Sequence, residues 1–345
     1  MDNNYTPRPT TARQRRLAAR AAKQRKIILA IAVCFVLILL MFFILIVGNI
    51  VSLFADDTSD SPDGEQNDIQ GNLPSEGEDP SNGEDELPAD DPNTTYVPVA
   101  PDAVRRGNLI LVNTTHEYIF PTINQNLINV YDSQALSGTL SNYFQLPSSS
   151  LLMDKTAYNA LDKMMQAFYA QTAIPNVIVS TAYRTYAEQE GKSVPPGYSD
   201  SHTGLSFALN VITNDGKTTG LSSDPIYDWI FDNCYKYGFT VRYPDGKEAL
   251  TQVSDYNYYF RYVGYVHAYI MKINDMCLEE YIPYIQGYSK STPLAVTTDD
   301  GISHEIYYVP AAIDGSDTSL PVPSDHPYTV SGDNEAGFIV TVTMS

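Results

Sequence analysis

Apolar and polar positions divide the chain into segments of very different character. Residues 27–54 form a run of 28 residues without a charged side chain, longer than the ~20 residues that a helix needs to cross a bilayer core. Residues 55–104 are rich in Asp, Glu, Pro, Gly and Ser, with few apolar positions, so they cannot bury enough surface to offset the entropy of ordering. Ordered patterns begin near Arg105. The pattern therefore predicts a transmembrane helix, a disordered acidic linker and a folded region.

Within the folded region, apolar spacing predicts both helices and strands. Residues 154–172 carry apolar side chains at helical spacing after Asp154, a suitable N-cap. Residues 225–238 begin with Pro and end with Gly, which favours a second helix, and 265–285 is also predicted to be helical. β-branched and aromatic runs predict strands at 109–113, 176–186, 239–243, 258–264 and 304–311, and strand–turn–strand at 327–344.

The order of these elements favours the α+β fold class. We expect a domain over residues 105–290, with a small antiparallel sheet flanked by helices, and a C-terminal β-rich appendage over 291–345. Cys234 and Cys277 both fall in the domain. A disulfide between them is permitted outside the cell, and two buried thiols are equally consistent with the sequence.

The distribution of charge predicts the orientation of the chain in the membrane. Residues 1–26 hold eight basic residues and one acidic residue, whereas residues 56–91 hold fourteen acidic residues and no basic ones. A basic flank before a span stays in the cytoplasm, and 27–54 is too long for a cleaved signal peptide. We therefore predict a single-pass protein of the cell membrane, with residues 1–26 as a cytoplasmic tail and the C-terminal domain outside. The net charge of −20 argues against nucleic acid as a partner.

Several blocks, met in order between residues 107 and 287, carry a family resemblance. They are 107-GNLILVN-113, 181-TAYRTYAEQ-189, 236-KYGFTVRYPDGKEALT-251, 261-RYVGYVHA-268 and 278-LEEYI-282. Together they resemble the VanY-type D-alanyl-D-alanine carboxypeptidases. The resemblance implies a zinc DD-peptidase fold and an activity that removes the last D-Ala from peptidoglycan stem peptides.

The catalytic motifs of this family depart from their pattern here. The family supplies His and Asp to zinc from one motif, and a second His with a catalytic Glu from another; three protein ligands leave one zinc position for the water that is activated. In the register of 198-YSDSHTGLSFALNV-211, the first His and the Asp fall on Ser201 and Ala208. The Glu and the second His fall on Tyr256 and Tyr259. The resemblance therefore implies a degenerate member with no metal site, no catalytic residue and no zinc cofactor.

Other positions of the family's site are retained. Arg184 matches the residue that receives the substrate carboxylate, which an Arg can hold with two parallel hydrogen bonds. Thr181, Tyr183 and Gln189 stand at matching polar positions, and we include His202 as a candidate substrate-binding residue beside a turn. Shifting the register to make His202 a zinc ligand places no carboxylate at the required spacing.

Three functions follow from this resemblance. The first is a membrane-anchored extracellular pseudopeptidase that binds peptidoglycan stem peptides, or a cell-envelope protein, without hydrolysis. The alternative is an active D-alanyl-D-alanine carboxypeptidase with a different metal arrangement or a metal-free route. The third is a structural spacer without a ligand.

Overall fold

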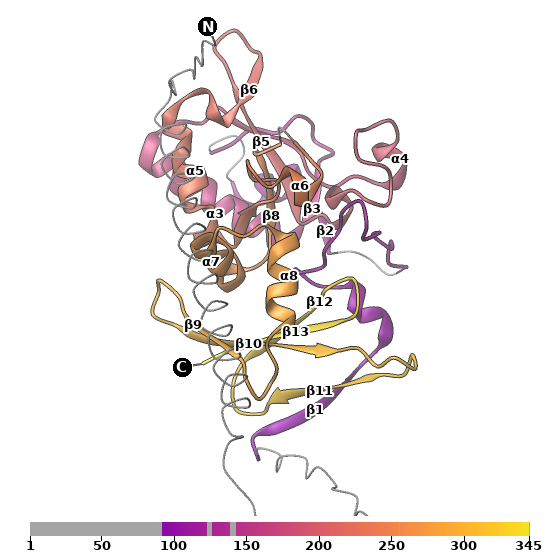
Figure 1. The fold of residues 1–345 in the computed structure, drawn as a ribbon. Coiled ribbons are helices and arrows are strands. Elements are labelled where there is room, and N and C mark those ends of the chain that lie inside the picture. The colour runs from indigo at the N-terminus through magenta and orange to yellow at the C-terminus, as the bar shows by residue number, and fades with distance from the viewer. Residues whose placement is uncertain (1–91, 123–125, 139–142, 255, 345) are drawn as a thin grey trace, which may run out of the picture. The chain divides into compact units, whose positions relative to one another are not determined.

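The computed structural model describes residues 92–122, 126–138, 143–254 and 256–344 (Figure 1). The predicted tail and transmembrane helix, and the linker up to residue 91, lie outside these residues. Across the described ranges, no helix combines the length and the apolar character needed to cross a membrane. The described part has the mixed α+β architecture that the sequence predicts.

A five-stranded antiparallel sheet forms the centre of the domain. Its strands are, in spatial order, Val177–Thr181 (β4), Ser206–Ile212 (β5), Tyr259–Tyr262 (β8) and Phe239–Val241 (β7), with Thr218–Gly220 (β6) pairing to β5. Successive side chains of a strand point to opposite faces, and Phe207 and Leu209 of β5 pack into the main core. Ala208 and Asn210 therefore face the other side of the sheet.

Helix α3 (Lys155–Thr172) supplies much of the main core and confirms the helix predicted from periodicity. Asp154 caps it, because its side chain accepts hydrogen bonds from the backbone N–H groups of Thr156 and Ala157. The predicted helix at 225–238 is broken into a 3₁₀ turn, helix α5 (Asp228–Asn233) and a second 3₁₀ turn.

The predicted helix at 265–285 is two helices, α7 (Tyr265–Asn274) and α8 (Leu278–Gln286). The break occurs at Asp275, whose φ of 55° is left-handed and ends the first helix. Both helices pack in a second core with Leu109 and Leu111. Cys277 immediately precedes α8, and it and Cys234 are free, buried thiols.

The segment 109–113 is not a strand, contrary to prediction. Leu109, Leu111 and Val112 are buried, but their backbone groups bond to side chains and to a loop carbonyl rather than to the backbone of a neighbouring strand. The Leu111 N–H donates to the carbonyl of Asp333, and the carbonyl of Val112 accepts from Arg242. Apolar burial alone produced the strand-like pattern.

The appendage is built from two packed sheets. One has four strands in the order Tyr328–Gly332 (β12), Gly337–Thr343 (β13), Ser303–Pro310 (β10) and Leu294–Thr297 (β9). The other pairs Thr94–Val99 (β1) with Thr318–Pro323 (β11), and their apolar side chains share a core. Strand β1 lies within residues 55–104, so the ordered structure begins before Arg105 and the predicted linker boundary is corrected.

Short elements complete the chain between these parts. They are Pro101–Arg105 (η1), Leu127–Asn129 (β2), Val130–Ser137 (α2), Leu152–Asp154 (β3), Tyr186–Gln189 (α4), Asp200–Thr203 (η2), Leu221–Ser223 (η3) and Glu248–Thr251 (α6).

Candidate functional site

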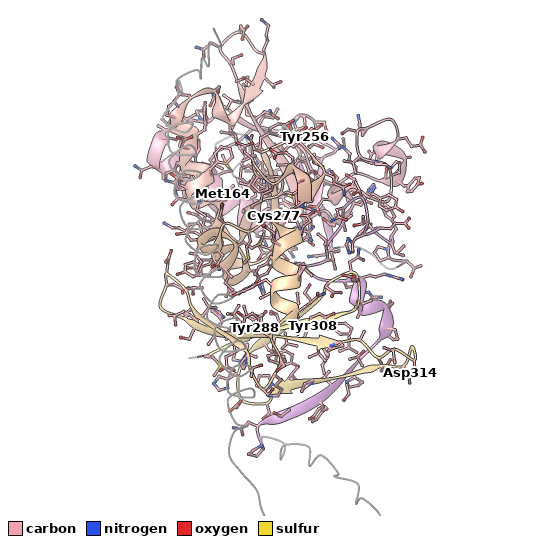
Figure 2. The ribbon with its side chains drawn as sticks, in the orientation of Figure 1. Met164, Tyr256, Cys277, Tyr288, Tyr308 and Asp314 are labelled. Atoms are coloured by element: carbon pink, nitrogen blue, oxygen red, sulfur yellow. The ribbon has the colours of Figure 1, made fainter. Side chains whose placement is uncertain are left out.

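A cavity of about 260 Å³ lies on the face of the central sheet opposite the main core. Strands β4, β5 and β8, the loop that follows α4 and the 3₁₀ turn η2 all contribute to it. Tyr256, labelled in Figure 2, also lines it and is 39% exposed. The described lining residues are Ser180, Thr181, Arg184, Gln189, Lys192, Ser193, Val194, Ser199, Ser201, Ala208, Asn210, Tyr243, Val253, Tyr256, Tyr258 and Tyr259.

The structure brings together the four positions that the resemblance assigns to zinc chemistry. Ser201, Ala208, Tyr256 and Tyr259 all line the cavity. The Ser201 and Tyr259 hydroxyl groups form a hydrogen bond with each other. Ala208 stands directly opposite Tyr259 in the β5–β8 register. Residues 58 positions apart thus meet at one point, as the motif alignment requires.

The chemistry of this donor set does not fit zinc. Zinc in proteins is bound by imidazole nitrogen, thiolate sulfur or carboxylate oxygen, and the converging groups are two hydroxyls and a methyl. Burial raises the pKa of Tyr259 to about 12, so its phenol stays protonated at neutral pH. Among the described residues, no three His, Cys, Asp or Glu side chains are grouped so as to hold a metal ion.

Arg184 is held in the cavity by its neighbours. Its backbone N–H donates to the carbonyl of Ser201 at 3.3 Å, and its Nη1 donates to Oε1 of Gln189 at 3.4 Å. Gln189 is 2% exposed, and its Nε2 in turn donates to the carbonyl of Val194 at 2.8 Å. Thr181 also lines the cavity. Arg184, Thr181 and Gln189 therefore lie together, as the sequence predicts.

The other two candidate substrate-binding residues lie outside the lining. Tyr183 is half-buried, and burial raises its pKa. His202 is fully buried behind Arg184: its Nδ1 lies 2.7 Å from the Arg184 carbonyl oxygen, and its Nε2 accepts from the Gly197 N–H at 3.0 Å. The carbonyl needs a donor, so Nδ1 carries the proton and the ring is neutral. Burial lowers its pKa, which favours the same state. His202 supports Arg184 from behind.

Asp200 has a role that sequence reasoning missed. It is fully buried in η2. Its Oδ1 pairs with Nη1 of Arg261 and lies 3.5 Å from Nε of Arg242, and its Oδ2 accepts from the hydroxyl of Ser206. Arg242 also pairs with Glu279 at 2.8 Å.

This ion-pair network fastens η2 to the sheet next to Ser201. The sequence contained a hint of these ion pairs, because Arg242 lies in the block 236–251 and Arg261 in the block 261–268. Asp200 could have been predicted as the acidic partner of these two arginines.

Comparisons with known proteins agree with this architecture. Residues 191–265 match the family model described as VanY: D-alanyl-D-alanine carboxypeptidase. A D-alanyl-D-alanine carboxypeptidase of Enterococcus faecium is 29% identical over 258 residues, which cover 72% of this chain and 80% of that protein. One from Enterococcus faecalis is 31% identical over 128 residues, covering 37% of this chain and 46% of that protein.

A solved structure extends the similarity to three dimensions. The vancomycin resistance D,D-dipeptidase VanXYg, crystallised in complex with a D-Ala-D-Ala phosphinate analog, superposes with a TM-score of 0.62 at 26% identity. The match covers 73% of this chain and 99% of that one. The family model and these relatives together support a domain of the VanY D-alanyl-D-alanine carboxypeptidase family in this chain.

Proposed function

We propose that this protein binds peptidoglycan stem peptides that end in D-Ala-D-Ala, without zinc-dependent hydrolysis. One observation carries the proposal: the cavity presents Arg184 beside a Ser201–Tyr259 hydrogen bond, which stands where the resemblance places zinc ligands. Arg184, which the resemblance assigns to carboxylate binding, lines the cavity, and the groups at two positions assigned to metal ligands, Ser201 and Tyr259, are hydroxyls.

The lining suits a peptide end. A guanidinium can hold a terminal carboxylate by two parallel hydrogen bonds, and the hydroxyls of Ser180 and Thr181 offer partners for peptide groups. Tyr256 and Tyr258 stack with ring centroids 5.4 Å apart and give one wall an apolar surface. The site can therefore hold a ligand, whereas nothing at Ser201 or Tyr259 can activate a metal-bound water.

Membrane anchoring forms part of the proposal. The charge-free run 27–54, flanked by a basic segment, supports a span, and the acidic residues 56–91 support an extended tether. Such a protein would present its cavity to the cell wall outside the membrane.

Binding tests the proposal directly. Calorimetry of the full chain with an N-acylated tripeptide ending in D-Ala-D-Ala should show saturable binding. Arg184→Gln should weaken it at least tenfold, because a hydrogen-bonded charge pair is worth about 1.5–3 kcal/mol. The matched control is Arg105→Gln, an exposed arginine in η1. Equal affinity of wild type and Arg184→Gln would overturn the proposal.

A working carboxypeptidase is the second candidate, and the names of the relatives in Enterococcus favour it. Metal analysis of the purified protein, followed by an assay of D-Ala release with and without chelator, separates the two. One zinc per chain with chelator-sensitive release would establish hydrolysis.

A further inference from the structure

Two cations line the cavity, and no carboxylate of the described residues lines it with them. They are Arg184 and Lys192. Within the described part of the chain, neither has an ion-pair partner within 4.0 Å. The carboxylate of Glu188 bonds instead to the backbone N–H and hydroxyl of Thr185, at 2.8 and 2.9 Å. Glu188 is close enough to Arg184 for a charge interaction, but its hydrogen bonds go to Thr185, so the hydrogen-bonding groups of both cations can serve a ligand.

The same groups hold both cations in place. Gln189 contacts the Arg184 guanidinium through Oε1 and the carbonyl of Val194 through Nε2. The Lys192 N–H donates to the Gln189 carbonyl at 3.2 Å. His202 links the Arg184 carbonyl to Gly197, at the end of the same loop. The backbone of the loop that carries Lys192 is therefore fastened to Arg184 at both ends, which keeps both residues in the lining of the same cavity.

The size and charge of the cavity limit its ligand. The chain as a whole carries a net charge of −20. In contrast, the cavity is lined by two cations and by no carboxylate of the described residues, so it attracts anions. Its volume of about 260 Å³ lies below the ~300–1,000 Å³ of common small-molecule sites, so it holds a chain end rather than a whole stem peptide. Two carboxylates confined in that space repel each other, and this repulsion is offset only if each carboxylate has its own cation.

We infer that the site selects peptide ends that bear two carboxylates, with Arg184 binding the terminal one and Lys192 a second one on a neighbouring side chain. The inference rests on the proposed function and specifies its ligand class. Lys192 is then a specificity-determining residue. An exposed pair of this kind changes affinity by a few-fold, less than the effect of Arg184.

Two tripeptides that differ by one charge test it. N-acetyl-D-Glu-D-Ala-D-Ala and N-acetyl-D-Gln-D-Ala-D-Ala are nearly isosteric, so their affinity ratio isolates the second carboxylate. Calorimetry on the full chain at 50 mM salt should give an approximately fivefold preference for the Glu peptide, falling at 500 mM as screening increases. Lys192→Gln should bring the ratio of the two affinities close to one, whatever its effect on the affinity for each peptide alone. Lys163→Gln, an exposed lysine on α3, is the matched control.

The outcomes separate this inference from the proposed function. Equal binding of both peptides by wild type, or a preference that survives Lys192→Gln, overturns the inference. If Arg184→Gln still weakens both peptides in that case, the proposed function stands. Absence of binding by either peptide overturns both. Lys192 is exposed, so an unchanged melting temperature of Lys192→Gln will show that the loss of preference is not a folding defect.

Discussion

Single residues set the charge balance beneath the cavity. Asp200 is a lone carboxylate that contacts two arginines, and all three side chains are inaccessible to solvent. A buried charge is tolerated only where it is paired and hydrogen-bonded. Arg261 meets this condition with Asp200 and the carbonyls of Asn108 and Ile110. The network therefore specifies the position of η2, and with it the position of Ser201.

Asp200→Asn should destabilise the fold strongly. The amide keeps the shape of the side chain but removes its charge, so Arg261 is left as a buried cation without a counter-charge. Breaking a buried pair in this way costs about 3–5 kcal/mol, measurable as a lower urea midpoint at pH 7.

Asp215→Asn is the control, because Asp215 pairs with Lys217 at an exposed site and should change the midpoint little. A midpoint for Asp200→Asn equal to that of wild type would show that Arg261 is satisfied by the carbonyl groups alone.

At the scale of elements, local patterns were predictable and long-range pairings were not. Helix α3 has both a periodic apolar face and a cap, signals contained within one window of sequence. The strand predicted at 109–113 failed because its partners are side chains and backbone from distant segments. Strand β1 was missed because its partner β11 begins more than 200 residues later, and nothing near β1 reveals it.

The site shows the same division. The meeting of Ser201, Ala208 and Tyr259 was predictable from motif spacing. The position of His202 outside the cavity was not predictable, because its partners are backbone groups of a loop whose conformation only the folded structure shows.

The three elements η2, β5 and β8 should accept a metal if its ligands are supplied. Ser201→His, Ala208→Asp and Tyr259→His in one chain would place two imidazoles and a carboxylate where two hydroxyls now touch and a methyl stands opposite. Three such ligands suit zinc. We expect about one zinc per triple-variant chain after dialysis, measured by metal analysis.

The double variant Ala208→Asp with Tyr259→His lacks one ligand and should retain less zinc. A folded triple variant, checked by circular dichroism, that retains no zinc would show that the backbone positions do not converge as the motif register requires.

At the scale of the whole molecule, the appendage is joined to the domain through a buried polar contact. His267 of α7 lies with Nδ1 2.6 Å from the hydroxyl of Tyr281 in α8, and with Nε2 3.0 Å from the hydroxyl of Thr341 in β13. Ile306 and Ile339 of the appendage pack in the same core as α7 and α8. The domain and the appendage therefore share one hydrophobic core.

This junction should make the fold sensitive to acid. Burial lowers the pKa of His267 to about 3, with a smaller contribution from nearby His304, whereas an unfolded His titrates near 6.5. Below pH 6.5 the unfolded state therefore binds more protons than the native state. The contribution of His267 is fully present above that pH and is lost as the pH falls towards 3. Between pH 7.5 and 5.0, urea denaturation should show a loss of about 2 kcal/mol from this residue.

The change of the unfolding free energy with pH, rather than its value at one pH, shows whether His267 is the titrating group. His267→Gln removes the titrating ring, so its unfolding free energy should fall less over the same interval even if the variant is less stable at pH 7.5. Asp215→Asn should keep the wild-type slope, because hydrogen bonds lower the pKa of the Asp215 carboxyl and it titrates below this interval. Because His202 is also buried and neutral, its pKa is lowered in the same direction and a residual slope should remain in His267→Gln. A His267→Gln slope equal to that of wild type would mean that the junction admits water and that the ring titrates as it does in the unfolded chain.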